Sequence, residues 1–259
     1  MANHREDRPP QRPLRIEAIG IDADDTLWHN EPLYQETQQR LVDGLARFAS
    51  SDEVKAHLLS TERGNLALYG YGIKSFILSM IETALDFGGD EIDHQTIQEI
   101  LRLGRTMIAA DVVLLPHVRE TVSLLAHTYP LWLITKGDLL DQRRKLDRSG
   151  LAPYFVEVDV VTEKTAEVYA KLLNERGVDP QCFVMVGNSP RSDIQPVVSL
   201  GGTAILVPYH VMWEHEASSD EPPPHHVIDH FGELPGLLAA LSPSRRSLFQ
   251  RIGRSRRTL

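Results

Sequence analysis

The chain has too little cysteine and too few long apolar runs for a disulfide-linked secreted protein or a membrane protein. Cys182 is its one cysteine, which excludes an intrachain disulfide. No apolar run approaches the roughly 18 residues of a membrane-spanning helix, and the start lacks the apolar segment of a secretory signal. We therefore expect no membrane span and a location in the reducing cytoplasm.

Positive charge is scarce over most of the chain. The formal net charge is −9, although the first 14 residues carry +1 and the segment after Ser242 carries six arginines and no acid. Residues 15–242 therefore carry −16, which argues against nucleic acid as a partner of this region. We predict a flexible N-terminal tail at 1–14 and a basic, disordered C-terminal tail at 243–259, although such a tail could also contact nucleic acid or anionic lipid.

The second half of the chain alternates between strand-like and helical patterns. The predicted strands are 130–135, 155–161, 182–187 and 203–207, and the predicted helices are 114–129, 138–150, 165–177 and one that begins near Pro190. A short edge strand at 226–231 and a closing helix at 234–241 follow. Alternation of this kind indicates βαβ units and a parallel sheet.

Residues 29–111 have helical apolar spacing instead. Leu41, Leu45 and Phe48, for example, fall on one face of a helix. This segment interrupts the α/β pattern after its first strand. We predict an α/β fold: a doubly wound, Rossmann-like parallel sheet formed by residues 15–28 and 112–242, with an α-helical cap domain inserted at residues 29–111.

Three acids follow the first predicted strand, Ile16 to Ile21. Asp22, Asp24 and Asp25 fall just past its end, at the edge where open α/β sheets bind their ligands. An acidic turn that ends a strand is the simpler interpretation, since Asp is common in turns. Three adjacent acids repel one another unless a cation or a proton lies among them, and this favours a functional site.

Other predicted strands also end in polar residues. Thr135 and Lys136 follow the second strand, Lys164 the third, and Asn188 and Asp193 the fourth. Singly, each has an ordinary explanation: a hydroxyl that caps a helix, a surface lysine, or turn residues. Together they bring acids, a hydroxyl, an ammonium and an amide to one edge of the sheet. That combination indicates an active site.

The same residues resemble the motifs of the haloacid dehalogenase superfamily, whose members are mostly magnesium-dependent phosphatases. The sequence DADDT, with Asp22 and Thr26, is similar to its first motif, and LWLIT, ending in Thr135, to its second. Lys164 is similar to the third motif, and VGNSPRSD, with Asn188 and Asp193, to the fourth. The resemblance covers roughly residues 15–242 and implies a helical cap inserted after the first motif.

The resemblance implies a role for each motif residue. Asp22 would be the nucleophile that forms an aspartyl-phosphate, and Asp24 the acid that protonates the departing alcohol and then deprotonates water. The phosphoryl oxygens would be held by Thr135, Lys136 and Lys164. A small phosphorylated metabolite is the expected partner.

The resemblance also implies a magnesium site. The Asp22 carboxylate, the Asp24 main-chain carbonyl, Asn188 and Asp193 would bind Mg²⁺, which prefers oxygen ligands. Asn188 stands where Asp is more usual. Its amide oxygen suits magnesium but carries no charge, so we expect Asp193 to matter more and metal affinity to be lower.

Three further features depart from the common pattern or leave alternatives open. Asp25 stands where glycine is frequent; it could support the site residues without touching substrate, but we expect it to face solvent, as most Asp residues do. Lys136 stands where asparagine is frequent, and either contacts an anionic substrate or pairs with Glu163. The loop from Tyr69 to Lys74 carries two glycines, and either closes over the leaving group or simply connects two helices.

These observations favour a magnesium-dependent phosphatase that acts on a small phosphomonoester. A hydrolytic dehalogenase also uses the first Asp as nucleophile, but it needs neither a metal nor an acid for a halide leaving group, so Asp24 favours phosphoryl transfer. A phosphomutase is a further possibility on the same fold. A non-catalytic binding protein is favoured only by Asn188 and the basic tail.

Overall fold

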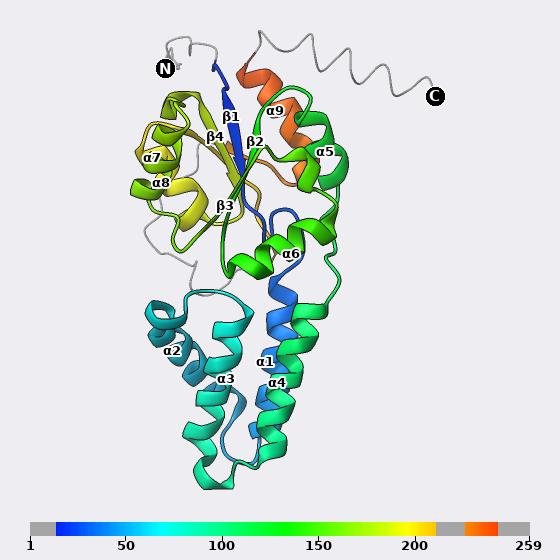
Figure 1. The fold of residues 1–259 in the computed structure, drawn as a ribbon, viewed down its shortest axis with the longest axis vertical. Helices are drawn as coiled ribbons and strands as arrows, with labels where there is room; N and C mark the ends of the chain where they lie inside the picture. The colour runs from blue at the N-terminus through cyan, green and yellow to red at the C-terminus, as the bar shows by residue number, and fades with distance from the viewer. Residues whose placement is uncertain (1–13, 211–225, 243–259) are drawn as a thin grey trace, which may run out of the picture.

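The structure is a computed structural model that describes residues 14–210 and 226–242. The predicted C-terminal tail, and all but Leu14 of the predicted N-terminal tail, lie outside these residues. A helix-covered sheet and a bundle of four longer helices follow one another along the long axis of the molecule (Figure 1).

The sheet has six strands in the order β3-β2-β1-β4-β5-β6, and every pair is parallel. The strands are β1 (Ala18–Ile21), β2 (Leu131–Lys136), β3 (Glu157–Val161), β4 (Phe183–Gly187), β5 (Thr203–Leu206) and β6 (His226–Val227). The chain runs from β1 outward to β3 and then returns to the other side of β1. The predicted doubly wound parallel sheet is therefore confirmed, and its switch point lies between β1 and β4.

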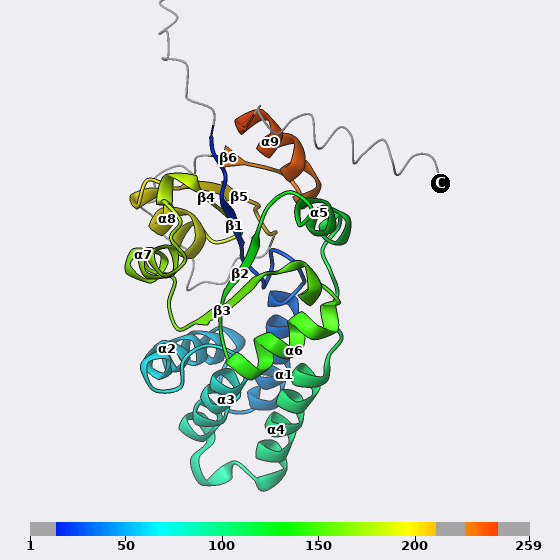
Figure 2. The same cartoon turned by 45° about the horizontal axis from the view of Figure 1, so that its top comes forward.

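Both faces of the central strands are buried, which explains why β1, β2 and β4 are apolar at almost every position, whereas the edge strand β3 carries Glu157 and Asp159 and is half-buried. In β2, Leu131 and Leu133 pack on one face with helices α5 and α9, whereas Trp132 and Ile134 pack on the other with α7 and α8. Figure 2 shows these two helix layers on opposite sides of the sheet. The layers are α5 (Val118–Leu125) and α9 (Leu234–Leu241) on one face, and α7 (Ala166–Glu175) and α8 (Gln195–Ser199) on the other.

Residues 29–111 form four helices with an apolar cluster of their own. These are α1 (Glu31–Leu45), α2 (Ser51–Tyr69), α3 (Ile73–Gly88) and α4 (His94–Ala109). Leu45, Leu58 and Met80 are fully buried at their centre. A Cβ at Gly104 would lie 2.7 Å from the Ile77 side chain, so glycine is what lets α3 and α4 approach closely.

Two helices differ from the sequence-based prediction. The helix expected from residue 114 begins only at Val118, because His117 has a left-handed φ of 67°. The helix expected near Pro190 opens as one π-helical segment, Pro190–Ile194, before α8. Helix α6 (Leu139–Ser149) ends as predicted at Gly150, whose φ is 70°.

Short 3₁₀ segments complete the described fold, at Gly89–Glu91, Ala152–Tyr154, Pro180–Cys182 and Phe231–Glu233. Within residues 14–210 and 226–242, no helix combines the length and the apolar character that crossing a bilayer requires.

Candidate active site

The seven site residues predicted from the sequence line one cavity between the carboxyl edge of the sheet and the helical bundle. They are Asp22, Asp24, Thr135, Lys136, Lys164, Asn188 and Asp193. The cavity volume is about 140 Å³. It lies at the switch point of the sheet, because β1 supplies the first motif and the neighbouring β4 leads into Asn188 and Asp193.

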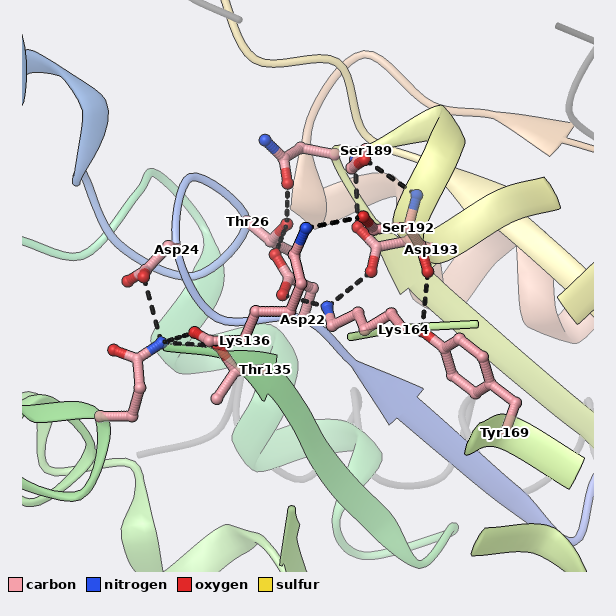
Figure 3. A network of polar contacts seen from close by, with 12 residues as sticks. Asp22, Asp24, Thr26, Thr135, Lys136, Lys164, Tyr169, Ser189, Ser192 and Asp193 are labelled. Carbon is pink, nitrogen blue, oxygen red and sulfur yellow. Dashed lines mark hydrogen bonds and ion pairs between the residues drawn. The ribbon is translucent and has the colours of Figure 1, made fainter. Parts of the chain in front are cut away.

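Lys164 joins the first and fourth motifs. Its Nζ donates to Asp22 Oδ1, and lies 2.7 Å from Asp193 Oδ1; Figure 3 shows the ammonium between the two carboxyl groups. The exposed fractions of Asp22, Lys164 and Asp193 are 7%, 4% and 0%. Lys164 is therefore a buried, doubly paired cation, and the surface-lysine alternative is wrong.

The protonation of this cluster reflects burial and mutual charge. Burial alone would lower the pKa of Lys164, but the carboxylates of Asp193 and Asp22 outweigh it and raise that pKa. Burial raises the pKa of Asp193 to about 7, against the lowering effect of Lys164 and with a further increase from Asp22. With two carboxyl groups and one ammonium, the cluster has more potential negative than positive charge. A further cation would therefore be bound favourably.

Thr26 holds the nucleophile candidate next to the fourth motif. Its Oγ1 lies 3.1 Å from Asp22 Oδ2 and 3.2 Å from Asn188 Oδ1, so its single proton is shared between the two oxygens. At the end of β4, a Cβ on Gly187 would lie 2.2 Å from Asp193 Oδ2. Glycine is required there because Asp193 folds back against the strand, where Ser189 N also donates to it at 3.0 Å.

Asp24 accepts hydrogen bonds from three side chains. Lys145 Nζ lies 2.8 and 3.1 Å from its two carboxyl oxygens, Trp28 Nε1 donates at 2.7 Å, and Gln142 Nε2 at 3.1 Å. Lys145 Nζ also donates to Asn30 at 2.9 Å. The carboxyl group of Asp24 is therefore fixed in orientation at the edge of the cavity.

Sequence reasoning missed Gln142 and Lys145, which both come from α6. The available signal was their spacing: they lie three residues apart on the helix that follows the second motif, and so share one of its faces. Gln142 Nε2 also donates to Thr135 Oγ1 at 2.6 Å and to the Lys136 carbonyl at 2.8 Å. Thr135 is not the N-cap of α6, because Asp138 has that role and accepts from Asp141 N at 3.0 Å.

The match to known proteins agrees with this geometry. Residues 16–201 match the family of haloacid dehalogenase-like hydrolases. The chain belongs to this family. A solved haloacid dehalogenase-like hydrolase from Xanthomonas campestris is 36% identical, with a TM-score of 0.80, and the match covers 92% of this chain and 97% of that one.

Two of the curated relatives that the chain matches are named as phosphatases. N-acylneuraminate-9-phosphatase of Homo sapiens is 30% identical over 150 residues, which is 54% of this chain and 55% of that protein. Glyceraldehyde 3-phosphate phosphatase of Methanothermobacter thermautotrophicus is 34% identical over 98 residues, or 36% of this chain and 43% of that protein. The chain thus spans about half the length of the curated relatives it matches.

Asp25 is buried, so its predicted exposure to solvent is wrong. Only 8% of the residue is exposed, and its φ is 59°. Its carboxyl group accepts from Asn30 N at 2.9 Å and from Glu31 N at 3.1 Å, where α1 begins. Burial raises the pKa of Asp25 to about 7, despite the lowering effect of these hydrogen bonds. Asp25 thus ties the first motif to the first helix of the bundle.

The loop between α2 and α3 contacts the core across the cavity. Tyr71 Oη donates to Glu163 Oε1 at 2.6 Å, and Lys74 Nζ lies 2.9 Å from Asp138 Oδ2. Lys136 Nζ lies 4.6 Å from the centroid of the Tyr71 ring, and 3.0 Å from Ser192 Oγ. Since Tyr71 also lines the cavity, the loop does more than connect two helices.

The donor set of the cavity fits magnesium. In the part of the chain that the structure describes, no group of three or more His, Cys, Asp or Glu side chains is arranged to hold a metal. Asp22 and Asp193 nevertheless supply two carboxylates, and Asn188 an amide oxygen, within one cavity. A small all-oxygen set suits Mg²⁺, which usually keeps several water ligands and takes one or two carboxylates from the protein.

Proposed function

We propose that the protein is a magnesium-dependent phosphatase that hydrolyses a small phosphomonoester through an aspartyl-phosphate. One observation carries the proposal: the buried Asp22 carboxylate shares its cavity with Asp24 as an acid and Lys164 as a cation. In this proposal residues 15–28 and 112–242 form the catalytic core, and residues 29–111 form a cap over the substrate.

In the first step, an Asp22 carboxylate oxygen attacks phosphorus, and the ester bond between phosphorus and the leaving oxygen breaks. Asp24 gives a proton to that oxygen, so an alcohol departs. Lys164, Lys136 and the Thr135 hydroxyl hold the phosphoryl oxygens while charge develops on them. The buried position of Lys164 strengthens its interaction with these oxygens, because little water screens it.

In the second step, Asp24 takes a proton from a water molecule. The water oxygen bonds to phosphorus, the bond to the Asp22 oxygen breaks, and inorganic phosphate leaves. Lys145, Trp28 and Gln142 hold Asp24 in one orientation through both transfers. Over the two steps, one ester and one water molecule are consumed, one alcohol and one inorganic phosphate leave, and Asp22 and Asp24 return to their starting states.

Magnesium would be held by the carboxylates of Asp22 and Asp193, the Asn188 amide oxygen and the Asp24 main-chain carbonyl. When bound, it supplies positive charge that lets an anionic nucleophile approach an anionic phosphoryl group. Asn188 lies within this donor set, next to the Thr26 hydroxyl, so its replacement of the more usual Asp still leaves an oxygen in place.

Two observations favour phosphoryl transfer over dehalogenation. The named relatives are phosphatases, and three side chains fix Asp24, an acid that a halide leaving group does not require. The same intact set of groups argues against a binding protein without activity.

The test is release of inorganic phosphate from p-nitrophenyl phosphate. We expect turnover with Mg²⁺, loss of at least 95% of it with EDTA, and recovery when Mg²⁺ is restored. Asp22→Asn should lower turnover by at least about 10³-fold, since a covalent nucleophile is removed. Asp147→Asn, on the exposed side of α6, should retain activity. Halide release from a haloacid without metal, and no phosphate release, would overturn the proposal.

A further inference from the structure

The cavity is strongly acidic for a site that takes a phosphate ester. Its lining carries eight carboxyl groups against three lysines, and no arginine among the described residues. The acids are Asp22, Asp24, Asp25, Glu31, Glu62, Asp138, Asp141 and Asp193, and the lysines are Lys136, Lys145 and Lys164. Asp22 and Asp193 form ion pairs with Lys164, and in the proposed function they also bind magnesium. Of the remaining acids, Glu31 and Glu62 come from residues 29–111, which in the proposed function form the cap over the substrate.

Resting on the proposed function, we propose that this cavity selects phosphomonoesters with a cationic or neutral leaving group and disfavours those with a second anionic group. An amine on the leaving group is the best match. The cavity volume of about 140 Å³ is below the range of about 300–1,000 Å³ for drug-sized ligands, so the leaving group is short.

The cap contributes negative charge alone to the cavity lining. Glu31 is the first residue of α1, and Glu62 lies on α2. No described lysine or arginine from residues 29–111 lines the cavity. Lys74, which is close in sequence to the lining loop, instead pairs with Asp138 of the core at 2.9 Å. Lys74 is thus already paired with a carboxylate of the lining, and a second anion on the substrate would have to compete with Asp138 for it.

The negative charges of these acids affect the pKa of Tyr34, which lines the same cavity. Burial raises the pKa of Tyr34 well above its ordinary value, and nearby negative charges raise it further. In decreasing order of effect, those charges belong to Asp24, Asp141, Glu62 and Glu31. The charges that oppose ionisation of this phenol would equally oppose a substrate carboxylate placed beside it.

The two other lysines of the lining, Lys145 and Lys136, are already engaged. Lys145 Nζ lies within 3.1 Å of both Asp24 oxygens and donates to Asn30. Lys136 Nζ lies 3.0 Å from Ser192 Oγ, and in the proposed function it holds the phosphoryl oxygens, so it is not available to a second anion. The cavity lining also contains a hydrogen-bond acceptor that no donor satisfies. Gln142 Oε1 is buried and has no hydrogen-bond partner among the described residues. An ammonium or hydroxyl group can donate to such acceptors, whereas a carboxylate cannot.

Three phosphate esters of equal length test this selectivity: 2-aminoethyl phosphate, 2-hydroxyethyl phosphate and phosphoglycolate. They place an ammonium, a hydroxyl and a carboxylate at corresponding positions. We expect kcat/KM with Mg²⁺ at pH 7.5 to fall in that order, with at least a tenfold difference between the first and the last. Their inhibition constants against p-nitrophenyl phosphate should rank in the same order, which gives a readout even for slow substrates.

Charge removal provides a matched pair of variants. Glu62→Gln should reduce the ratio of kcat/KM for 2-aminoethyl phosphate over phosphoglycolate at least threefold, because it removes a cap charge from the lining. Asp90→Asn removes an exposed charge from the 3₁₀ segment between α3 and α4, which does not line the cavity, and should leave the ratio unchanged.

The outcomes separate the two proposals. If the protein releases no phosphate from p-nitrophenyl phosphate or any ester, the proposed function fails. If it hydrolyses p-nitrophenyl phosphate but turns over or binds phosphoglycolate as well as 2-hydroxyethyl phosphate, only the charge selectivity is overturned. Equal ratios in Glu62→Gln and the unmodified protein would also overturn it.

Discussion

The two walls of the cavity are built in opposite ways. On the core side, the Lys164 and Asp193 side chains form an ion pair with exposed fractions of 2% and 1%. On the side formed by residues 29–111, Lys74 pairs with Asp138 of the core, and these side chains have exposed fractions of 58% and 26%. Exposed pairs contribute about 0–1 kcal/mol, whereas breaking a buried pair costs several times more. We call the residues of the sheet edge around Lys164 the core wall, and the cavity-lining residues of 29–111 the cap wall. The core wall is therefore fixed, whereas the contacts that hold the cap wall to the core break easily.

The difference suits the two tasks of the proposed enzyme. Phosphoryl transfer requires a nucleophile, an acid and a cation in constant geometry, which a buried network at the ends of β-strands supplies. Substrate entry and product release require a surface that can separate from the core. The Tyr71–Glu163 and Lys74–Asp138 contacts join the cap to the core without burying either pair.

The largest effect is expected from Lys164→Met, which breaks the core wall. Asp22 and Asp193 would remain buried without their cation. We expect the free energy of unfolding, measured by urea denaturation in EDTA, to fall by about 3–5 kcal/mol. Lys171→Met, on the exposed face of α7, should change it by less than about 0.5 kcal/mol. Equal stability of the two variants would show that the buried network does not stabilise the fold.

Lys145→Met tests the group that orients Asp24. We expect kcat to fall about 10–100-fold for an alkyl phosphate, whose leaving oxygen needs a proton. This is less than the roughly 10²–10⁴-fold that a general acid contributes, because Asp24 itself remains. The decrease should be much smaller for p-nitrophenyl phosphate, whose leaving group is stable without one. Lys145→Arg should recover part of the activity because it keeps the charge. A uniform decrease for both esters would assign Lys145 a purely structural role.

Asp25→Ala tests the link between the two walls. It removes the acceptor for the main-chain amides at the start of α1 and places alanine at a φ of 59°. We expect a loss of about 1–2 kcal/mol in the free energy of unfolding, typical of a lost helix cap. Asp25→Asn keeps an acceptor and tolerates a left-handed φ, so its thermal melting should stay close to that of the unmodified protein. A large loss in Asp25→Asn would mean that the charge itself is required.

Tyr71→Phe should have the smallest effect, because it weakens only the cap wall. The variant loses the 2.6 Å hydrogen bond to Glu163 and keeps the ring beside Lys136. We expect KM to rise about two- to fivefold with kcat nearly unchanged, in line with the modest net value of one hydrogen bond at the surface. Tyr69→Phe, an exposed neighbour, is the control. A large decrease in kcat would place the Tyr71 hydroxyl among the catalytic groups.

The sequence predicted most of the fold because its signals were local. The runs that form β1, β2 and β4 are apolar on both faces, and Gly150 and Gly177 end their helices with a φ of 70° and 65°. The start of α5 was missed because the left-handed φ of His117 has no signal as clear as a glycine.

The candidate site was predicted less completely than the fold. Gln142 and Lys145 lie on a polar helix, and a polar helix normally faces solvent. Burial of Leu146 against the core turns that helix so that Gln142 and Lys145 reach Asp24. The burial of Asp25 was not predicted for a similar reason, since it depends on where α1 begins.

By itself, the sequence determined the parallel sheet, the helical insert and the residues at the strand ends, because periodicity and strand termini follow from local chemistry. Only the tertiary structure decided that Lys164 lies between Asp22 and Asp193, that α6 orients Asp24 and that the helical insert at residues 29–111 adds Glu31 and Glu62 to the cavity lining. These contacts join residues far apart in the chain. Their geometry depends on how the layers pack, and no local pattern encodes that.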